Sequence, residues 1–156
     1  MPETQVRKID SYNCTSEGTL NALETLLIRK FGGEWDFSQR ATGIAAGTRP
    51  PGNTPNKVIE TIRKEPCLIP EIMLPFNDQI LSVEEYYSPD PLNVDHRYIG
   101  KKFLDTYKIG HEWVETDRKS LTEALKLSPL GISVYAWEQD QKGLYISTGS
   151  DNHWTM

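Results

Sequence analysis

Two residues of this chain are of the types that nucleophilic catalysis needs, a thiol and an imidazole. Cys14 lies at the start of a predicted helix, and His153 begins a predicted final strand. A neighbouring imidazole can take the thiol proton and, as imidazolium, stabilise the thiolate. The thiolate is then the nucleophile that attacks an electrophilic carbon. A helix N-terminus also favours negative charge. From the residues alone, Cys14 is either an activated nucleophile or a buried small apolar residue, and His153 either a base or a surface histidine.

The composition predicts one acidic domain. The 156 residues carry a net charge of −5, and 37% of them are hydrophobic, enough for a core. The acidic, unclustered charge offers no footprint for nucleic acid. No apolar run approaches the roughly 18 residues of a membrane span. The polar start, MPETQVRKIDSYN, has no apolar stretch typical of a signal peptide.

The remaining thiol and imidazoles favour structural roles. Cys67 follows a proline in a predicted loop, which suggests a buried or partly buried thiol. His96 starts a predicted helix, and His111 alternates with Trp113 along a predicted strand. The chain has no CxxC pair and its histidines are widely spaced, so no metal site is predicted.

The predicted elements are helices in the first two thirds and strands in the last third. Leu20, Leu23 and Leu27 recur at spacings of three and four, which predicts a helix over 14–30. Further helices are predicted after Ser38 and at 55–64, 83–87, 94–107 and 121–127, and strands at 109–115, 131–137, 144–148 and from His153. Such segregation is typical of an α+β domain rather than a doubly wound sheet.

Helix starts and one turn are marked by their residue types. Ser38 and Thr54 are predicted N-caps, with Pro55 at the first helical position of the second helix. The run Ser120-Leu-Thr-Glu predicts a capping box. The polar stretch EQDQKG, with Gly143, predicts a hairpin turn between two strands.

An ordered set of short segments carries a family resemblance. They are Gln5, Cys14, LNALE (20–24), FSQR (37–40), PPGNTPNKVIETIRK (50–64), CLIPEIMLPF (67–76), LTEALKLSPLGISVYAW (121–137) and DNH (151–153). Together they resemble the papain-like cysteine peptidases, most of all the short bacterial and phage-type members. The resemblance implies a single papain-like domain, with a helical part at about 1–107 and a strand-rich part at about 108–156 whose sheet is incomplete.

The resemblance also implies a role for each candidate residue. Cys14 would attack the carbonyl of a peptide bond in a protein or in peptidoglycan, through an acyl-enzyme, with His153 as the base. The side chain of Gln5 and the backbone N–H of Cys14 would form the oxyanion hole. Gly52 and Asn53 would hydrogen-bond an extended substrate peptide. No cofactor is implied.

The sequence departs from the family at the thiol and at the imidazole. Residues 15–18 read Thr-Ser-Glu-Gly, where the family usually has aromatic or apolar residues. Glu17, one turn from the thiol, opposes thiolate formation, unless it faces solvent or caps the helix. In the family, an Asn or Asp on a later strand orients the imidazole. Asp151 and Asn152 are too close to His153 in sequence to be favoured for this role.

These departures leave the function open between two classes. One is a thiol peptidase or amidase. The other is a catalytically weak or inactive papain-fold protein that binds a peptide or protein in the cleft. A further hypothesis is that the chain is the front of a longer protein. Because 13 residues precede Cys14, we expect no inhibitory pro-segment, as in a cytoplasmic or phage-associated protein.

Overall fold

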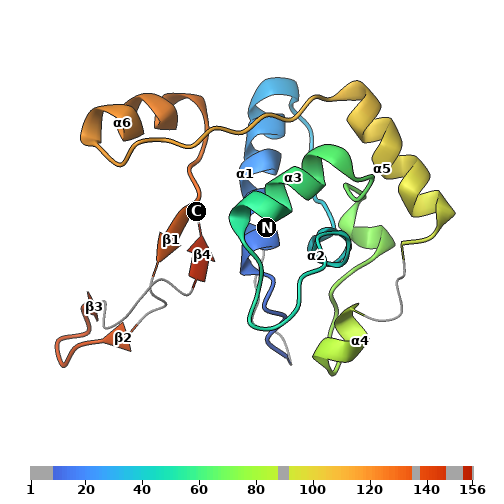
Figure 1. The fold of residues 1–156 in the computed structure, drawn as a ribbon, viewed down its shortest axis with the longest axis horizontal. Helices are drawn as coiled ribbons and strands as arrows, with labels where there is room; N and C mark the ends of the chain where they lie inside the picture. The colour runs from blue at the N-terminus through green and yellow to red at the C-terminus, as the bar shows by residue number, and fades with distance from the viewer. Residues whose placement is uncertain (1–8, 88–91, 135–137, 147–152, 156) are drawn as a thin grey trace.

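The computed structural model describes residues 9–87, 92–134, 138–146 and 153–155, and helices dominate these ranges. The helices are α1 (Cys14–Phe31), α2 (Gln39–Ala45), α3 (Pro55–Lys64), the 3-10 helix η1 (Glu71–Met73), α4 (Val83–Tyr87), α5 (Val94–Thr106) and α6 (Arg118–Leu127). The strands are β1 (Ile132–Val134), β2 (Glu138–Gln139), β3 (Tyr145–Ile146) and β4 (His153–Thr155). The chain is α+β, with helices before strands, as the sequence predicts (Figure 1).

The main hydrophobic core lies between α1, α3 and α5. Leu20 and Leu27 share one face of α1, since they lie about two helical turns apart. They pack in one cluster with Val58 and Ile62 of α3 and Phe103 of α5. Burying each such side chain contributes roughly 1.5–3 kcal/mol. This core fixes α1, and with it the position of its first residue.

The helix starts follow the predicted caps in two of three cases. The hydroxyls of Ser38 and Thr54 each accept a hydrogen bond from the N–H three residues on, at 3.0 and 3.3 Å. The predicted capping box at Ser120 is wrong. Asp117 caps α6 instead, and the helix begins at Arg118. The Asp117 carboxylate accepts from two backbone N–H groups, which a neutral serine hydroxyl does less strongly.

The predicted strand at 109–115 is also wrong. This segment crosses from α5 to α6 without regular secondary structure (Figure 1). Trp113 is 70% exposed, so the alternation of residue types along 109–115 does not place one face of the segment in the core. A strand needs a neighbouring ladder as well as a pattern, and none of the strands in the described ranges pairs with this segment.

The strands in the described ranges form two small antiparallel sheets. β1 pairs with β4, with Val134 opposite His153 and Ile132 opposite Thr155. β2 pairs with β3, and Gly143 in the turn between them has a left-handed φ of 77°. The predicted turn is therefore confirmed for residues 140–143, whereas Glu138 and Gln139 of the predicted turn form β2. The predicted strand at 131–137 instead supplies β1, whose partner is the final strand, while 135–137 lie outside the described residues.

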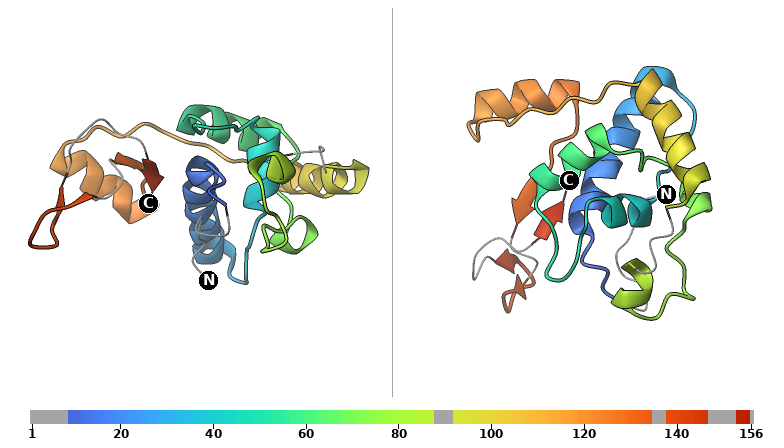
Figure 2. Two further views of the ribbon diagram at one scale, coloured as in Figure 1. Left: turned by 90° about the horizontal axis from the view of Figure 1, so that it is seen from below. Right: turned by 45° about the vertical axis from the view of Figure 1, so that its right-hand side comes forward.

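Helix α1 separates the helical body from the strands. Figure 2 shows α2, α3 and α5 on one side of α1, and α6 with the strands on the other. Every residue of α6 is at least partly exposed. β4 makes the contact with α1: a Cβ on Gly18 would lie 3.1 Å from the Trp154 indole. The strand region thus attaches to the body along the first turns of α1.

A candidate active site at the start of helix α1

Cys14 is the first residue of α1 and is half-buried. Its Sγ lies 3.9 Å from the hydroxyl oxygen of Thr15. Cys67 differs, because it is 1% exposed and burial raises the pKa of its thiol to about 12. At neutral pH Cys67 therefore stays an inert thiol, as its sequence position predicts. Cys14 is the accessible thiol of the two.

The chain entering Cys14 is held by buried side chains. The Asn13 amide donates to the backbone oxygen of Gln39 at 2.7 Å and to the Tyr86 hydroxyl at 3.1 Å. The Tyr87 hydroxyl donates to the backbone oxygen of Ser11 at 2.8 Å. Burial raises the pKa of both tyrosines, so both phenols keep their protons. Two long-range anchors therefore fix the backbone on the N-terminal side of the thiol.

The same segment contains an unusual backbone conformation. Tyr12 has a left-handed φ of 56°, which costs a non-glycine residue about 1–3 kcal/mol. The Asp10 carboxylate accepts its N–H at 2.9 Å. Gly43 of α2 makes room for the segment, since a Cβ there would lie 2.5 Å from the Asn13 side chain. Strained backbone held by its surroundings is common next to functional groups.

The Gly52–Asn53 turn lies beside the start of α1. The Thr15 hydroxyl donates to the Asn53 backbone oxygen at 2.9 Å. A Cβ on Gly52 would lie 3.6 Å from the Tyr12 backbone oxygen. Gly52 has a φ of 132°, where glycine is favoured. The two residues predicted to hold a substrate therefore lie next to those that flank Cys14, and their binding role stays a prediction.

The final strand brings His153 to the same helix end. His153 is half-buried and opens β4, which confirms the predicted strand. Gly18, on the same face of α1 as Cys14 and one turn further on, contacts Trp154. β4 runs in the same direction as α1, with the C mark beyond its end (Figure 1). The two elements that carry the predicted nucleophile and base are adjacent, and the pairing of thiol and imidazole stays a prediction.

Glu17 is the departure from the family that the structure clarifies. Its side chain is 5% exposed, so the solvent-facing alternative is wrong. It lies in the first turn of α1, where the positive end of the helix dipole stabilises a carboxylate. Cys14 lies at the same end of the helix, so a buried carboxyl side chain lies one turn from the predicted nucleophile.

Glu24 joins the middle of α1 to the loop before α2. Its Oε1 accepts the Phe37 N–H at 2.7 Å. Burial raises the pKa of this carboxyl from 4.5 to about 7; the Phe37 bond opposes the rise, and Asp36 adds to it. This buried acid is structural, because it satisfies a loop N–H rather than facing Cys14's end of the helix.

The other predicted positions divide between structural roles and undescribed residues. His96 forms a capping box with Asn93 at the start of α5, as its position predicts. His111 lies 3.7 Å from the Glu60 carboxylate and is not on a strand. Gln5, predicted for the oxyanion hole, lies outside the described residues, as do Asp151 and Asn152.

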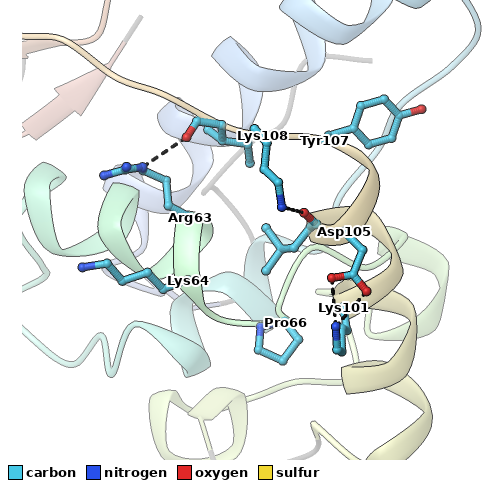
Figure 3. A pocket seen from close by; sticks show the side chains of 9 residues that line it. Arg63, Lys64, Pro66, Lys101, Asp105, Tyr107 and Lys108 are labelled. Carbon is cyan, nitrogen blue, oxygen red and sulfur yellow. Dashed lines mark hydrogen bonds and ion pairs between the residues drawn. The ribbon is translucent and has the colours of Figure 1, made fainter.

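A separate basic depression of about 470 Å³ lies between the C-terminal ends of α3 and α5 (Figure 3). Its cations are already partnered. Glu60 pairs with Arg63 and Lys64, and Asp105 pairs with Lys101. Lys108 donates to a backbone oxygen of α5 at 2.9 Å. Exposed pairs of this kind are structural surface contacts. The depression lies at the C-terminal end of α3. The Gly52–Asn53 turn, which contacts α1 beside Cys14, lies before the N-terminal end of α3.

The described ranges contain neither a metal-binding cluster nor a membrane-spanning helix. No three His, Cys, Asp or Glu side chains there gather into a group that could hold a metal ion. No helix in those ranges is long and apolar enough to cross a bilayer.

Comparison of the chain with protein-family models, with curated proteins and with solved structures gives no match. The functional assignment therefore rests on the residues and their geometry.

The residues that sequence reasoning missed are those that position the site. Asn13 and Tyr86 are 73 positions apart, so no local pattern joins them. Gly18 left a usable signal: a glycine inside a helix costs about 1 kcal/mol, which indicates that another element packs against it. The Tyr86-Tyr87 pair was predicted only as part of a short helix, without its hydroxyl partners.

Proposed function

We propose that this chain is a papain-like cysteine peptidase or amidase with Cys14 as nucleophile and His153 as base. One observation carries the proposal. An accessible thiol lies at the N-terminus of a long helix whose residues 15–18 are buried, between the Gly52–Asn53 turn and the strand that His153 opens. This is the arrangement that a thiol nucleophile, an imidazole base and an extended substrate require.

The segments that carry the family resemblance also contact one another. Glu24 of LNALE accepts the N–H of Phe37 in FSQR. Ser38 of FSQR donates to the backbone oxygen of Leu74 in CLIPEIMLPF at 2.6 Å. Glu71 of that segment donates its N–H to the backbone oxygen before FSQR at 2.9 Å. Segments chosen only by sequence order thus meet in space, which supports the papain-like assignment.

The proposed reaction follows from the roles of the two side chains. His153 takes the Cys14 thiol proton, and the thiolate adds to the scissile carbonyl carbon. The imidazolium protonates the leaving amine as the C–N bond breaks, which leaves a thioester on Cys14. Water, deprotonated by the imidazole, adds to the thioester carbon. The C–S bond then breaks, which releases the carboxylic product, and the imidazolium returns its proton to the Cys14 thiolate.

The start of α1 supplies one donor for the negative oxygen of the tetrahedral intermediate. The first backbone N–H groups of a helix have no partner inside it, and Cys14 is the first residue of α1. Its N–H is therefore suited to an oxyanion hole. Gln5 would supply the second donor. An extended peptide would hydrogen-bond to the backbone of Gly52 and Asn53, whose turn is held in place by bonds from the Gly52 N–H to Arg49 and from the Thr15 hydroxyl to the Asn53 oxygen.

Buried Glu17 favours a second candidate function. The papain-like peptidases usually have aromatic or apolar residues at this turn of the helix, and a protein that only binds peptides would tolerate the acidic residue found here. The cleft would then hold a peptide or protein without cleaving it. The two candidates differ in the chemistry of Cys14.

Alkylation of the thiol separates the two candidates. The full chain is treated with iodoacetamide at pH 6 and pH 8.5, and the modified cysteine is located by mass spectrometry. An ordinary thiol slows by more than about 100-fold over this range. A catalytic thiol paired with an imidazole slows by less than about 10-fold, and the label is on Cys14. Cys67→Ser is the matched control and leaves the labelling unchanged.

Cleavage of a mixed peptide pool completes the test. Wild type should produce new termini, and Cys14→Ala should produce none, while Cys67→Ser cleaves as wild type does. Full cleavage by Cys14→Ala, or labelling on Cys67, contradicts the proposed mechanism. An ordinary pH dependence without cleavage supports the binding protein instead.

A further inference from the structure

Arg49 is an exposed cation held in a fixed position. Its guanidinium carbon lies 4.6 Å from the centroid of the Tyr87 ring, a cation–π contact. The ring is itself immobile, because Tyr87 is 3% exposed and its hydroxyl donates to Ser11. One guanidinium nitrogen donates to the Thr48 backbone oxygen at 2.6 Å. Stacking and this bond together orient the planar fork.

The guanidinium has no carboxylate partner among the described residues. The ion pairs of those residues involve other cations, such as Arg63 with Glu60. Arg49 keeps most of its five N–H donors for other partners. A fixed arginine that has no acidic partner within the described part of the chain is notable, because the net charge is −5 and there are 22 Asp and Glu residues.

The position of Arg49 is at the candidate active site. Its backbone oxygen accepts the Gly52 N–H at 2.7 Å, so the two residues are paired across one tight turn. The Asn53 end of that turn bonds to Thr15, next to Cys14. Arg49, Asp10 and Cys14 all act electrostatically on the Tyr87 phenol. Arg49 therefore belongs to the turn whose other end contacts Thr15, the residue that follows Cys14.

We propose that Arg49 binds a carboxylate of the ligand, so that the cleft prefers acidic peptides. The guanidinium fork matches a carboxylate in a bidentate geometry, and preorganisation by the Tyr87 ring reduces the entropy lost on binding. The carboxylate belongs to an Asp or Glu side chain or to a peptide terminus near the scissile bond. The inference rests on the proposed function in one respect only, the position of the bound peptide beside Cys14.

The first test uses two small alkylating reagents on the full chain and needs no substrate. Iodoacetate carries a carboxylate, and iodoacetamide is its neutral counterpart. The iodoacetate rate at Cys14 divided by the iodoacetamide rate measures the attraction of an anion to the site. Because folding and thiolate content affect both reagents equally, they cancel in this ratio. Arg49→Gln should lower this ratio by about 3- to 10-fold, the range expected for the loss of one charge–charge attraction near a surface.

A matched control separates this effect from net charge. Arg29 is an exposed arginine near the opposite end of α1, about 20 Å along the helix from Cys14. Arg29→Gln makes the same charge change and should leave the ratio within twofold of wild type. An unchanged ratio in Arg49→Gln, or an equal drop in Arg29→Gln, overturns the carboxylate site.

The second test identifies the source of the carboxylate. Matched peptides carry Glu or Gln within three residues of the cleaved bond, each with a free or an amidated C-terminus. A drop of about 10-fold in kcat/KM for the Glu peptides in Arg49→Gln, with the Gln peptides unchanged, assigns a side-chain carboxylate. A drop confined to free C-termini assigns the terminus, and equal loss for all peptides contradicts the proposal. If wild type cleaves none but the reagent ratio responds to Arg49, the carboxylate site stands and the peptidase fails.

Discussion

Glu24 makes the stability of the helical body depend on pH, and Glu24→Gln tests the physical reason. The carboxylate is 9% exposed and accepts the Phe37 N–H, which ties α1 to the loop before α2. Burial raises its pKa from 4.5 to about 7. In the variant the amide oxygen can accept the same hydrogen bond, but the side chain carries no charge at any pH. The substitution therefore removes the cost of burying a charge and keeps the contact.

The sign of the effect follows from the direction of the shift. Because the folded-state pKa lies above the unfolded value, the unfolded chain releases this proton first as the pH rises. The contribution of Glu24 is fully present below about pH 4.5 and is lost as the pH rises through about 7. At about 1.4 kcal/mol per pKa unit the loss is at most about 3 kcal/mol, and solvent screening reduces it to about 1–2 kcal/mol.

Urea denaturation followed by tryptophan fluorescence measures this difference. Wild type and Glu24→Gln should have similar free energies of unfolding at pH 4.5. By pH 8 the variant should be more stable than wild type by about 1–2 kcal/mol. Glu34→Gln, at an exposed position, is the control and should follow wild type. A difference that stays constant with pH, or a variant that loses stability relative to wild type as the pH rises, would refute burial as the cause.

Two further predictions concern the neighbourhood of the thiol. Glu17→Gln should raise the rate of Cys14 alkylation by iodoacetamide at pH 7 by about 3- to 10-fold, because it removes a like charge one turn away. An equal or lower rate would mean that the carboxylate does not oppose the thiolate. Gly131→Ala places a Cβ 2.2 Å from the Trp154 indole and should destabilise the strand region by about 1–3 kcal/mol in thermal unfolding followed by tryptophan fluorescence. Gly110→Ala, with no atom within 4 Å of the new Cβ, should be neutral, and an equal loss there would contradict the steric explanation.

The local parts of the fold could be predicted because their causes lie within a few residues. The apolar spacing of Leu20 and Leu27 is enough to define α1, and a side-chain oxygen at Ser38 or Thr54 is enough to start a helix. The hairpin turn at Gly143 depends on one left-handed residue. Such features need no knowledge of the rest of the chain.

The sequence predictions that are wrong concern contacts between segments that are distant in the chain. The pattern at 109–115 resembles a strand, but pairing depends on a neighbour that the sequence does not specify locally. β1 pairs with β4, about twenty residues away, rather than with the next strand. At the candidate site, the type and helix position of Cys14 could be predicted. The Asn13 anchor and the Arg49–Tyr87 stack could not, because they join segments that only the fold brings together.

The attachment of β4 to α1 has a consequence for how the protein responds to heat. The three core clusters of the described residues lie in the helical body, whereas β1 and β4 are three-residue strands and α6 has no buried residue. Detaching the strands therefore takes less free energy than unfolding the body, so the two parts form separate cooperative units. Under the proposed function the nucleophile belongs to the stable unit and the base to the unstable one. Activity would then disappear on warming before the helices melt, and would return on cooling.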